Sequence, residues 1–143
     1  MPRPMPGLTP FMEWMDEYRV DIEAIDRQHQ GIVALINEVH HAMLTDAPPL
    51  VMDGIVRKLT TYAEEHFDFE EQCMELCHFS HLTEHRCQHR EMMRRITAFG
   101  AGIQEGDRST YQALLDFLME WLGEHILKSD HRYKDALHAA GLR

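Results

Sequence analysis

The chain has 143 residues, a length that predicts one domain with a buried core. Its formal net charge of −10 argues against nucleic acid or an anionic membrane surface as a partner, because both require clustered cations. The sequence shows neither a stretch long and apolar enough to cross a membrane nor an apolar secretory segment, and its three cysteines lack framework spacing. We therefore expect a cytoplasmic protein without membrane insertion.

The first half of the chain is expected to hold an arm and two helices. Residues 1–20 contain four of the six prolines and three aromatic residues, so we interpret them as an N-terminal arm whose aromatics dock onto the body. From Ile22 to Met43 the apolar positions recur with the 3.6-residue period of an amphipathic helix. Residues 45–49 include two prolines, which end that helix and favour a second one over residues 50–77.

The second half is expected to hold two more long helices and a short one. Ser80 can cap a third helix over residues 81–103. The loop after it is marked by Gly100, Gly102 and Gly106. A fourth helix is expected over residues 109–127, followed by a short tail helix over residues 130–140.

Four long helices with short connections predict an all-α fold. We expect an antiparallel up-down-up-down four-helix bundle over residues 21–143, with an N-terminal arm over residues 1–20 and a short C-terminal helix. In that topology the start of the first helix, the end of the second, the start of the third and the end of the fourth all meet at one end of the bundle.

Eleven histidines are the anomaly of the composition. Five of them and two carboxylates occur as a lone histidine, a His-x-x-x-Glu, a His-x-x-x-His and a His-x-x-x-x-Asp. Residues four apart on a helix share a face, so such a pair can direct two donors at one point. At a helical rise of 1.5 Å per residue, all seven fall within about 16 Å of the same end of the bundle. The candidate metal ligands are His29, His66, Glu70, His85, His89, His125 and Asp130.

This donor set favours a bridged pair of iron ions. Five imidazoles and two carboxylates are too few for two separate octahedral ions, but they suffice for two ions that share the carboxylates and keep one position open. The lack of thiolate disfavours structural zinc, whereas iron accepts both imidazole and bridging carboxylate. With a hydroxide bridge, two Fe(II) ions in this set carry only about one net positive charge, which lowers the cost of burial. Glu71 points about 100° away from Glu70 around the helix and is left out of the set.

The motifs resemble those of the hemerythrin family, and its single-domain bacterial members most closely. The resemblance covers residues 14–133, almost the whole chain. It is carried by Val20-Asp21-Ile22, Ile25-Asp26-Arg27-Gln28-His29, His66-Phe67-x-x-Glu70-Glu71-x-x-Met74, His85-x-x-x-His89 and Trp121-Leu122-x-x-His125-Ile126-x-x-x-Asp130. It implies a four-helix bundle with a non-heme, oxo- or hydroxo-bridged di-iron centre that binds O₂ reversibly.

The resemblance also implies how the ligands are divided between the two irons. One iron would take the three histidines His85, His89 and His125. The other would take His29 and His66 and keep a position open for O₂. Both irons would share Glu70 and Asp130.

The O₂ pocket is expected to be apolar, so that water and protons do not oxidise the iron. Helical spacing from the ligands selects Ile32, Phe67, Leu122 and Ile126 as its lining. Trp14 and Trp121 would pack behind them, and Gln28 could accept a hydrogen bond from a ligand imidazole.

Three functions remain open on these residues. The leading one is O₂ storage, transport or delivery by a protein that is not an enzyme, with O₂ as its partner and a monomeric or weakly oligomeric state. A second is O₂ or redox sensing through a separate partner. A third is a di-iron enzyme that detoxifies peroxide or nitric oxide. Di-iron oxygenases in helical bundles favour carboxylate-rich sites, whereas five neutral histidines favour reversible binding.

Overall fold

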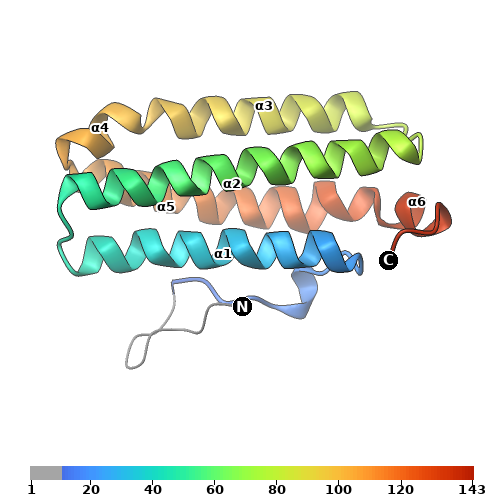
Figure 1. The fold of residues 1–143 in the computed structure, drawn as a ribbon, viewed down its shortest axis with the longest axis horizontal. Helices are drawn as coiled ribbons and strands as arrows, with labels where there is room; N and C mark the ends of the chain where they lie inside the picture. The colour runs from blue at the N-terminus through green and yellow to red at the C-terminus, as the bar shows by residue number, and fades with distance from the viewer. Residues whose placement is uncertain (1–10) are drawn as a thin grey trace.

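The computed structural model describes residues 11–143, and the four prolines of the predicted arm lie outside this range. Four helices lie side by side along the long axis of the molecule (Figure 1). They are α1 (Glu23–Leu44), α2 (Pro49–Leu76), α3 (Leu82–Ala98) and α5 (Arg108–Trp121). Successive helices run in opposite directions, α1 packs against both α2 and α5, and α2 packs against α3. Residues 11–143 contain no β-strand, so the prediction of an antiparallel four-helix bundle is confirmed.

Local sequence explains the turn between the first two helices and the start of α2. Pro49 occupies the first position of α2, where its fixed φ suits a helix and its missing N–H costs nothing. Asp46, in the connection before it, has a positive φ of 52°, a conformation that aspartate tolerates better than most residues. The short connection brings α2 back against α1.

The apolar core forms two clusters. The larger one runs along the bundle and includes Ile32, Phe67 and Ile126. The smaller one closes the end of the bundle and includes Ile25 and Tyr133. Each candidate ligand falls between residues of the two clusters along its own segment, as His29 does between Ile25 and Ile32. The seven candidate ligands, which we call the polar layer, are therefore enclosed by apolar side chains on both sides.

The expected third helix is shorter than predicted. α3 ends at Ala98, and a separate short helix, α4 (Gly100–Glu105), follows, so the prediction of one helix over residues 81–103 is wrong. Gly102 lies inside α4 rather than in a loop. A Cβ there would collide with the Thr110 side chain of α5, so close packing requires glycine at this position. Gly106 does end the helix, with the left-handed φ of 76° that glycine adopts at a C-cap.

Ser80 does not cap α3. The residue before this helix is His81, and no side chain caps it there. The chain instead turns at His78, which has a positive φ of 54°.

The largest departure lies at the end of the fourth helix. The α-helix predicted over residues 109–127 changes at Leu122 into a π-helix, η2 (Leu122–Ser129). A 3₁₀ turn, η3 (Asp130–Arg132), and a short helix, α6 (Lys134–Ala139), then replace the continuous tail helix predicted over residues 130–140. π-helices are rare and concentrate at functional sites.

The described part of the arm packs along the bundle, as its aromatic residues predict. It contains a short 3₁₀ turn, η1 (Asp16–Tyr18). Phe11, Trp14 and Tyr18 contact the larger core cluster. The backbone of Met12 exchanges two hydrogen bonds of 2.8 Å with the amide of Asn37 on α1.

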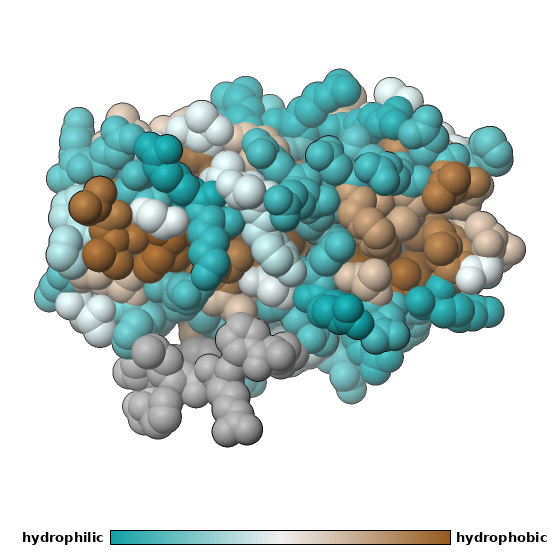
Figure 2. Space-filling view, viewed as in Figure 1, coloured by the Kyte–Doolittle hydropathy of each residue, from teal (hydrophilic) through white to brown (hydrophobic). Residues whose placement is uncertain are grey.

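The face shown in Figure 2 is mostly hydrophilic, with hydrophobic areas near both ends of α2, where Leu50 and Leu76 are 83% and 75% exposed. Among the described residues, no helix combines the length and apolar character needed to span a membrane.

Candidate metal centre

The start of α1 and the end of α2 lie at the same end of the bundle (Figure 1). The seven candidate ligands come together toward this end. They come from α1, α2, α3, η2 and η3, and each is at most 4% exposed. Three of them, His29, Glu70 and Asp130, have no exposed surface at all. Buried charged side chains of this kind occur only when they are paired or hold a metal ion.

The seven side chains form two groups whose donor atoms lie within 4.8 Å of one another. One group contains three histidines, His85, His89 and His125. The other contains two, His29 and His66. Glu70 and Asp130 belong to both groups. We call the first group the three-histidine group and the second the two-histidine group.

Each shared carboxylate directs one oxygen to each group. Glu70 places Oε1 3.0 Å from Nε2 of both His85 and His89, and Oε2 3.0 Å from Nε2 of His66. Asp130 places Oδ1 2.9 Å from His85 Nε2 and Oδ2 3.2 Å from His29 Nε2. A carboxylate that must serve two adjacent cations needs this division of its oxygens.

Several of these close atoms do not bond to one another. Both nitrogens of His29, Nε2 of His66 and both oxygens of Asp130 are buried without a hydrogen-bond partner in the structure. In addition, His89 Nε2 lies 3.1 Å from His125 Nε2, and at most one of two such nitrogens can donate to the other. Buried unpaired polar atoms are costly, and a cation among these lone pairs would satisfy them. The residues present therefore fit a metal pair.

Without a metal, protons on histidine have to balance the two carboxylates. Burial opposes the charged forms of His29 and His85, but the close carboxylates of Asp130 and Glu70 outweigh it and raise the pKa of each to about 9. Burial lowers the pKa of His66. Burial and the Glu70 charge would raise the pKa of Asp130, yet His125 and His29 hold it below its usual range. The site thus keeps both carboxylates ionised and attracts positive charge.

The π-helix explains how His125 and Asp130 can serve one site. They are five positions apart in the sequence, and in an α-helix residues at that spacing point to different faces. Hydrogen bonds between residues five apart, which define a π-helix, bring them back to one side. In the structure, His125 Nε2 lies 3.0 Å from Asp130 Oδ1. Helical periodicity in the sequence could not reveal this change.

Three further residues contact the candidate ligands from outside. His66 Nδ1 donates to Gln28 Oε1 over 2.6 Å, as predicted. Tyr133 donates its hydroxyl to Glu70 Oε2 over 3.0 Å and is fully buried, and burial next to Glu70 raises the pKa of this phenol. His89 Nδ1 donates to Glu71 Oε2 over 2.9 Å, and this bond lowers the pKa of Glu71.

The sequence reasoning did not identify the contacts of Tyr133 and Glu71. The only available signals were their positions, three residues after Asp130 and one after Glu70.

Aromatic and aliphatic side chains cover the polar layer. The four residues predicted to line the O₂ pocket are all buried and belong to the larger core cluster: Ile32, Phe67, Leu122 and Ile126. Phe67 stacks on His89 with ring centroids 3.9 Å apart, and Trp121 stacks on His125 at 5.0 Å. Trp14 lies at the edge of the same cluster. The four residues are thus buried and apolar, and their role in lining an O₂ pocket stays a prediction.

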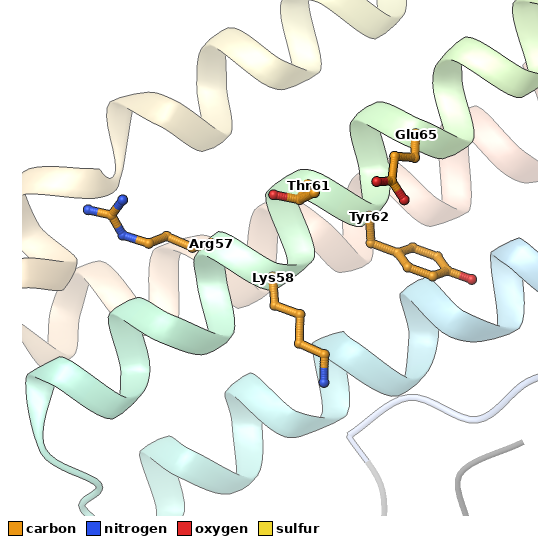
Figure 3. A pocket seen from close by; sticks show the side chains of 5 residues that line it. All are labelled: Arg57, Lys58, Thr61, Tyr62 and Glu65. Carbon is orange, nitrogen blue, oxygen red and sulfur yellow. The ribbon is translucent and has the colours of Figure 1, made fainter.

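A surface hollow elsewhere contains none of the candidate ligands. It has a volume of about 370 Å³ and is lined along the outer side of α2 by Arg57, Lys58, Thr61, Tyr62 and Glu65 (Figure 3). Its charged, exposed lining contrasts with the buried polar layer, so we assign the metal chemistry to the latter.

Comparisons with known proteins agree with this geometry. The family model for the hemerythrin HHE cation binding domain matches residues 20–137. The bacteriohemerythrin of Clostridium acetobutylicum is 31% identical over 127 residues, which cover 85% of this chain and 98% of that protein. The myohemerythrin of Riftia pachyptila is 29% identical, over 90% of this chain and 95% of that protein. A crystal structure of wild-type hemerythrin shares the fold, with a TM-score of 0.78 at 23% identity over 89% of this chain and 98% of that one. The chain belongs to the hemerythrin family.

Proposed function

We propose that this protein binds O₂ reversibly at a di-iron centre and serves oxygen storage, transport or delivery. The observation that carries the proposal is the division of Glu70 and Asp130, each of which directs one oxygen to the three-histidine group and the other to the two-histidine group. When bound, an iron pair supplies the electrons that O₂ takes up on binding and returns on release.

The two groups of candidate ligands would have different roles in O₂ binding. The three-histidine group offers five donor residues and the two-histidine group four, so we place the open position for O₂ beside His29 and His66. Ile32, one turn beyond His29, lies in the apolar cluster on that side and would exclude water from the bound gas. Gln28 would hold His66 in one tautomer through its 2.6 Å hydrogen bond.

We further propose that the protein is not an enzyme. Five neutral imidazoles and two carboxylates form a nitrogen-rich donor set, whereas the di-iron enzymes of helical bundles use carboxylate-rich ones. Fewer anionic ligands stabilise high-valent iron less, which supports release of O₂ rather than its reductive cleavage. Location in the cytoplasm and a monomeric or weakly oligomeric state remain predictions.

Metal analysis combined with optical spectroscopy tests the proposal. We expect two irons per chain and an oxygen-dependent absorption band that disappears under anaerobic conditions and returns in air over repeated cycles. One zinc per chain without a visible band would contradict it. A single irreversible oxidation in air would instead support the enzyme or sensor alternatives.

A pair of histidine variants makes the test specific to the site. His66→Ala removes a buried donor of the two-histidine group and should abolish O₂ binding. His81→Ala changes a histidine whose side chain is 51% exposed and should leave iron content and the absorption band unchanged. Equal behaviour of the two variants would show that the ligand assignment is wrong.

A further inference from the structure

His89 is held on both sides by consecutive residues of α2. Its Nε2 lies 3.0 Å from Glu70 Oε1, inside the polar layer. Its Nδ1, on the other side of the ring, donates to Glu71 Oε2 over 2.9 Å. The ring itself stacks on Phe67, also from α2, with centroids 3.9 Å apart. Three residues of one helix thus define both the plane and the direction of this imidazole.

Glu71 is itself held in place. Its second oxygen, Oε1, accepts a hydrogen bond of 3.2 Å from Nε of Arg86 on α3. Arg86 also lies 3.5 Å from Glu75, one turn further along α2. The Glu71 side chain is 21% exposed, so the carboxylate lies at the boundary between the polar layer and solvent. Arg86 therefore fixes the orientation in which Glu71 meets His89.

The other candidate histidines have different outer contacts. The outer nitrogen of His66 donates to a neutral amide, Gln28, and that of His29 is buried without a hydrogen-bond partner. Within residues 11–143, His89 is the one member of the five whose outer nitrogen contacts a carboxylate. The only anionic outer contact therefore falls on the three-histidine group.

We infer that Glu71 is a positioning residue that fixes His89 in the tautomer protonated at Nδ1 and makes its Nε2 a stronger donor to metal. This inference rests on the proposed di-iron function. A carboxylate behind a metal-binding imidazole raises its basicity more than an amide does, and loss of such a partner typically lowers metal affinity by roughly 10–100-fold. The iron of the three-histidine group is thereby retained more firmly than the iron on the open side.

Matched substitutions on α2 separate this role from surface ion pairing. Glu71→Gln keeps an acceptor near His89 but removes the charge, and Glu71→Ala removes both. Glu75→Gln removes the same charge from the other carboxylate that contacts Arg86, without touching His89. All three variants should load two irons, because every donor of both groups remains.

The readouts are iron release to a chelator, the reduction potential and helical content. Glu71→Gln should release one of its two irons roughly 10-fold faster than the unmodified protein, and Glu71→Ala up to about 100-fold faster. The reduction potential should rise in the same order, because a weaker donor stabilises Fe(III) less. Glu75→Gln should match the unmodified protein in both measurements, and circular dichroism should be the same for all four proteins.

Unchanged release and potential in both Glu71 variants would overturn the inference while leaving the proposed function intact. An equal change in Glu75→Gln would also overturn it, because the effect would then come from the surface charge. Failure of the unmodified protein to hold iron would contradict the proposed function and the inference together.

Discussion

The two sides of the metal centre are built differently. The two histidines of the two-histidine group lie on α1 and α2, which are regular α-helices, and His66 and Glu70 on α2 follow the i,i+4 rule. The three-histidine group rests on α3 and on η2, where the helix widens to a π-helix. Regular helical periodicity is enough to place the histidines of the first side, whereas His125 and the shared Asp130 need a distortion that only the convergence of distant segments explains.

Loss of a shared carboxylate should have the largest effect on iron content, because it removes a donor from both sides of the metal centre at once. Asp130→Asn removes the charge of a fully buried residue that contacts both groups, so we expect iron to fall from two per chain to less than one. Asp135→Asn, an exposed neighbour on α6, serves as the control and should keep both irons. Loss of iron from one group alone would show that Asp130 does not bridge them.

Removal of the metal should make stability depend on pH. In the metal-free protein the carboxylates raise the pKa of His29 and His85 to about 9 from 6.5, one histidine on each side. Because the folded pKa is raised, this stabilisation is fully present below about pH 6.5 and is lost as the pH rises through about 9. Denaturant unfolding of metal-free protein should show that decline. A free energy of unfolding that increases over the same range would contradict it.

Tyr133→Phe should test the contact that supports the bridge. It removes the hydroxyl that donates to Glu70 Oε2 and leaves the packing of the ring unchanged. Hydrogen bonds to charged groups contribute about 1.5–3 kcal/mol, so we expect a loss of that order in the free energy of unfolding. Tyr62→Phe, at a half-buried tyrosine of α2 that does not contact the candidate ligands, should cost little by comparison. Equal losses in the two variants would show that the hydrogen bond from Tyr133 to Glu70 does not contribute this stabilisation.

The two-histidine side has a glycine, Gly31, in the middle of α1, and its replacement should have the smallest effect on stability. A Cβ at this position would collide with the Tyr62 hydroxyl, which explains why glycine occurs within the helix. In a Tyr62→Ala background, Gly31→Ala should stabilise the protein by about 0.5–1 kcal/mol, the helical preference of alanine over glycine. In the unmodified protein the gain should be smaller, because the tyrosine has to move. Thermal unfolding of the four proteins measures the difference.

Much of this structure could be predicted from local pattern. The apolar period of α1 and the His66–Glu70 spacing on α2 follow from helical geometry, and both survive in the fold. The convergence of the seven residues on one layer follows from antiparallel topology alone. The Gln28 contact with His66 could also be predicted, because the residue next to a ligand is within reach of a neighbouring helix.

The rest depended on tertiary contacts. The π-helix arises where Asp130 must reach Glu70 and His29 from other helices, which no periodicity records. Glu71 points away from Glu70 on its own helix, yet α3 brings His89 to it. Glycine is common at helix ends, so Gly102 predicts a loop, whereas the close approach of the Thr110 side chain is what requires glycine there.

Mössbauer spectroscopy of the iron-loaded protein tests the central claim most directly, because it counts distinct irons and detects coupling between them. We expect two iron populations of equal size that couple magnetically once O₂ is admitted and return to their original spectrum when O₂ is removed. A single population, two uncoupled irons, or a spectrum that does not return would contradict a bridged pair that binds O₂ reversibly.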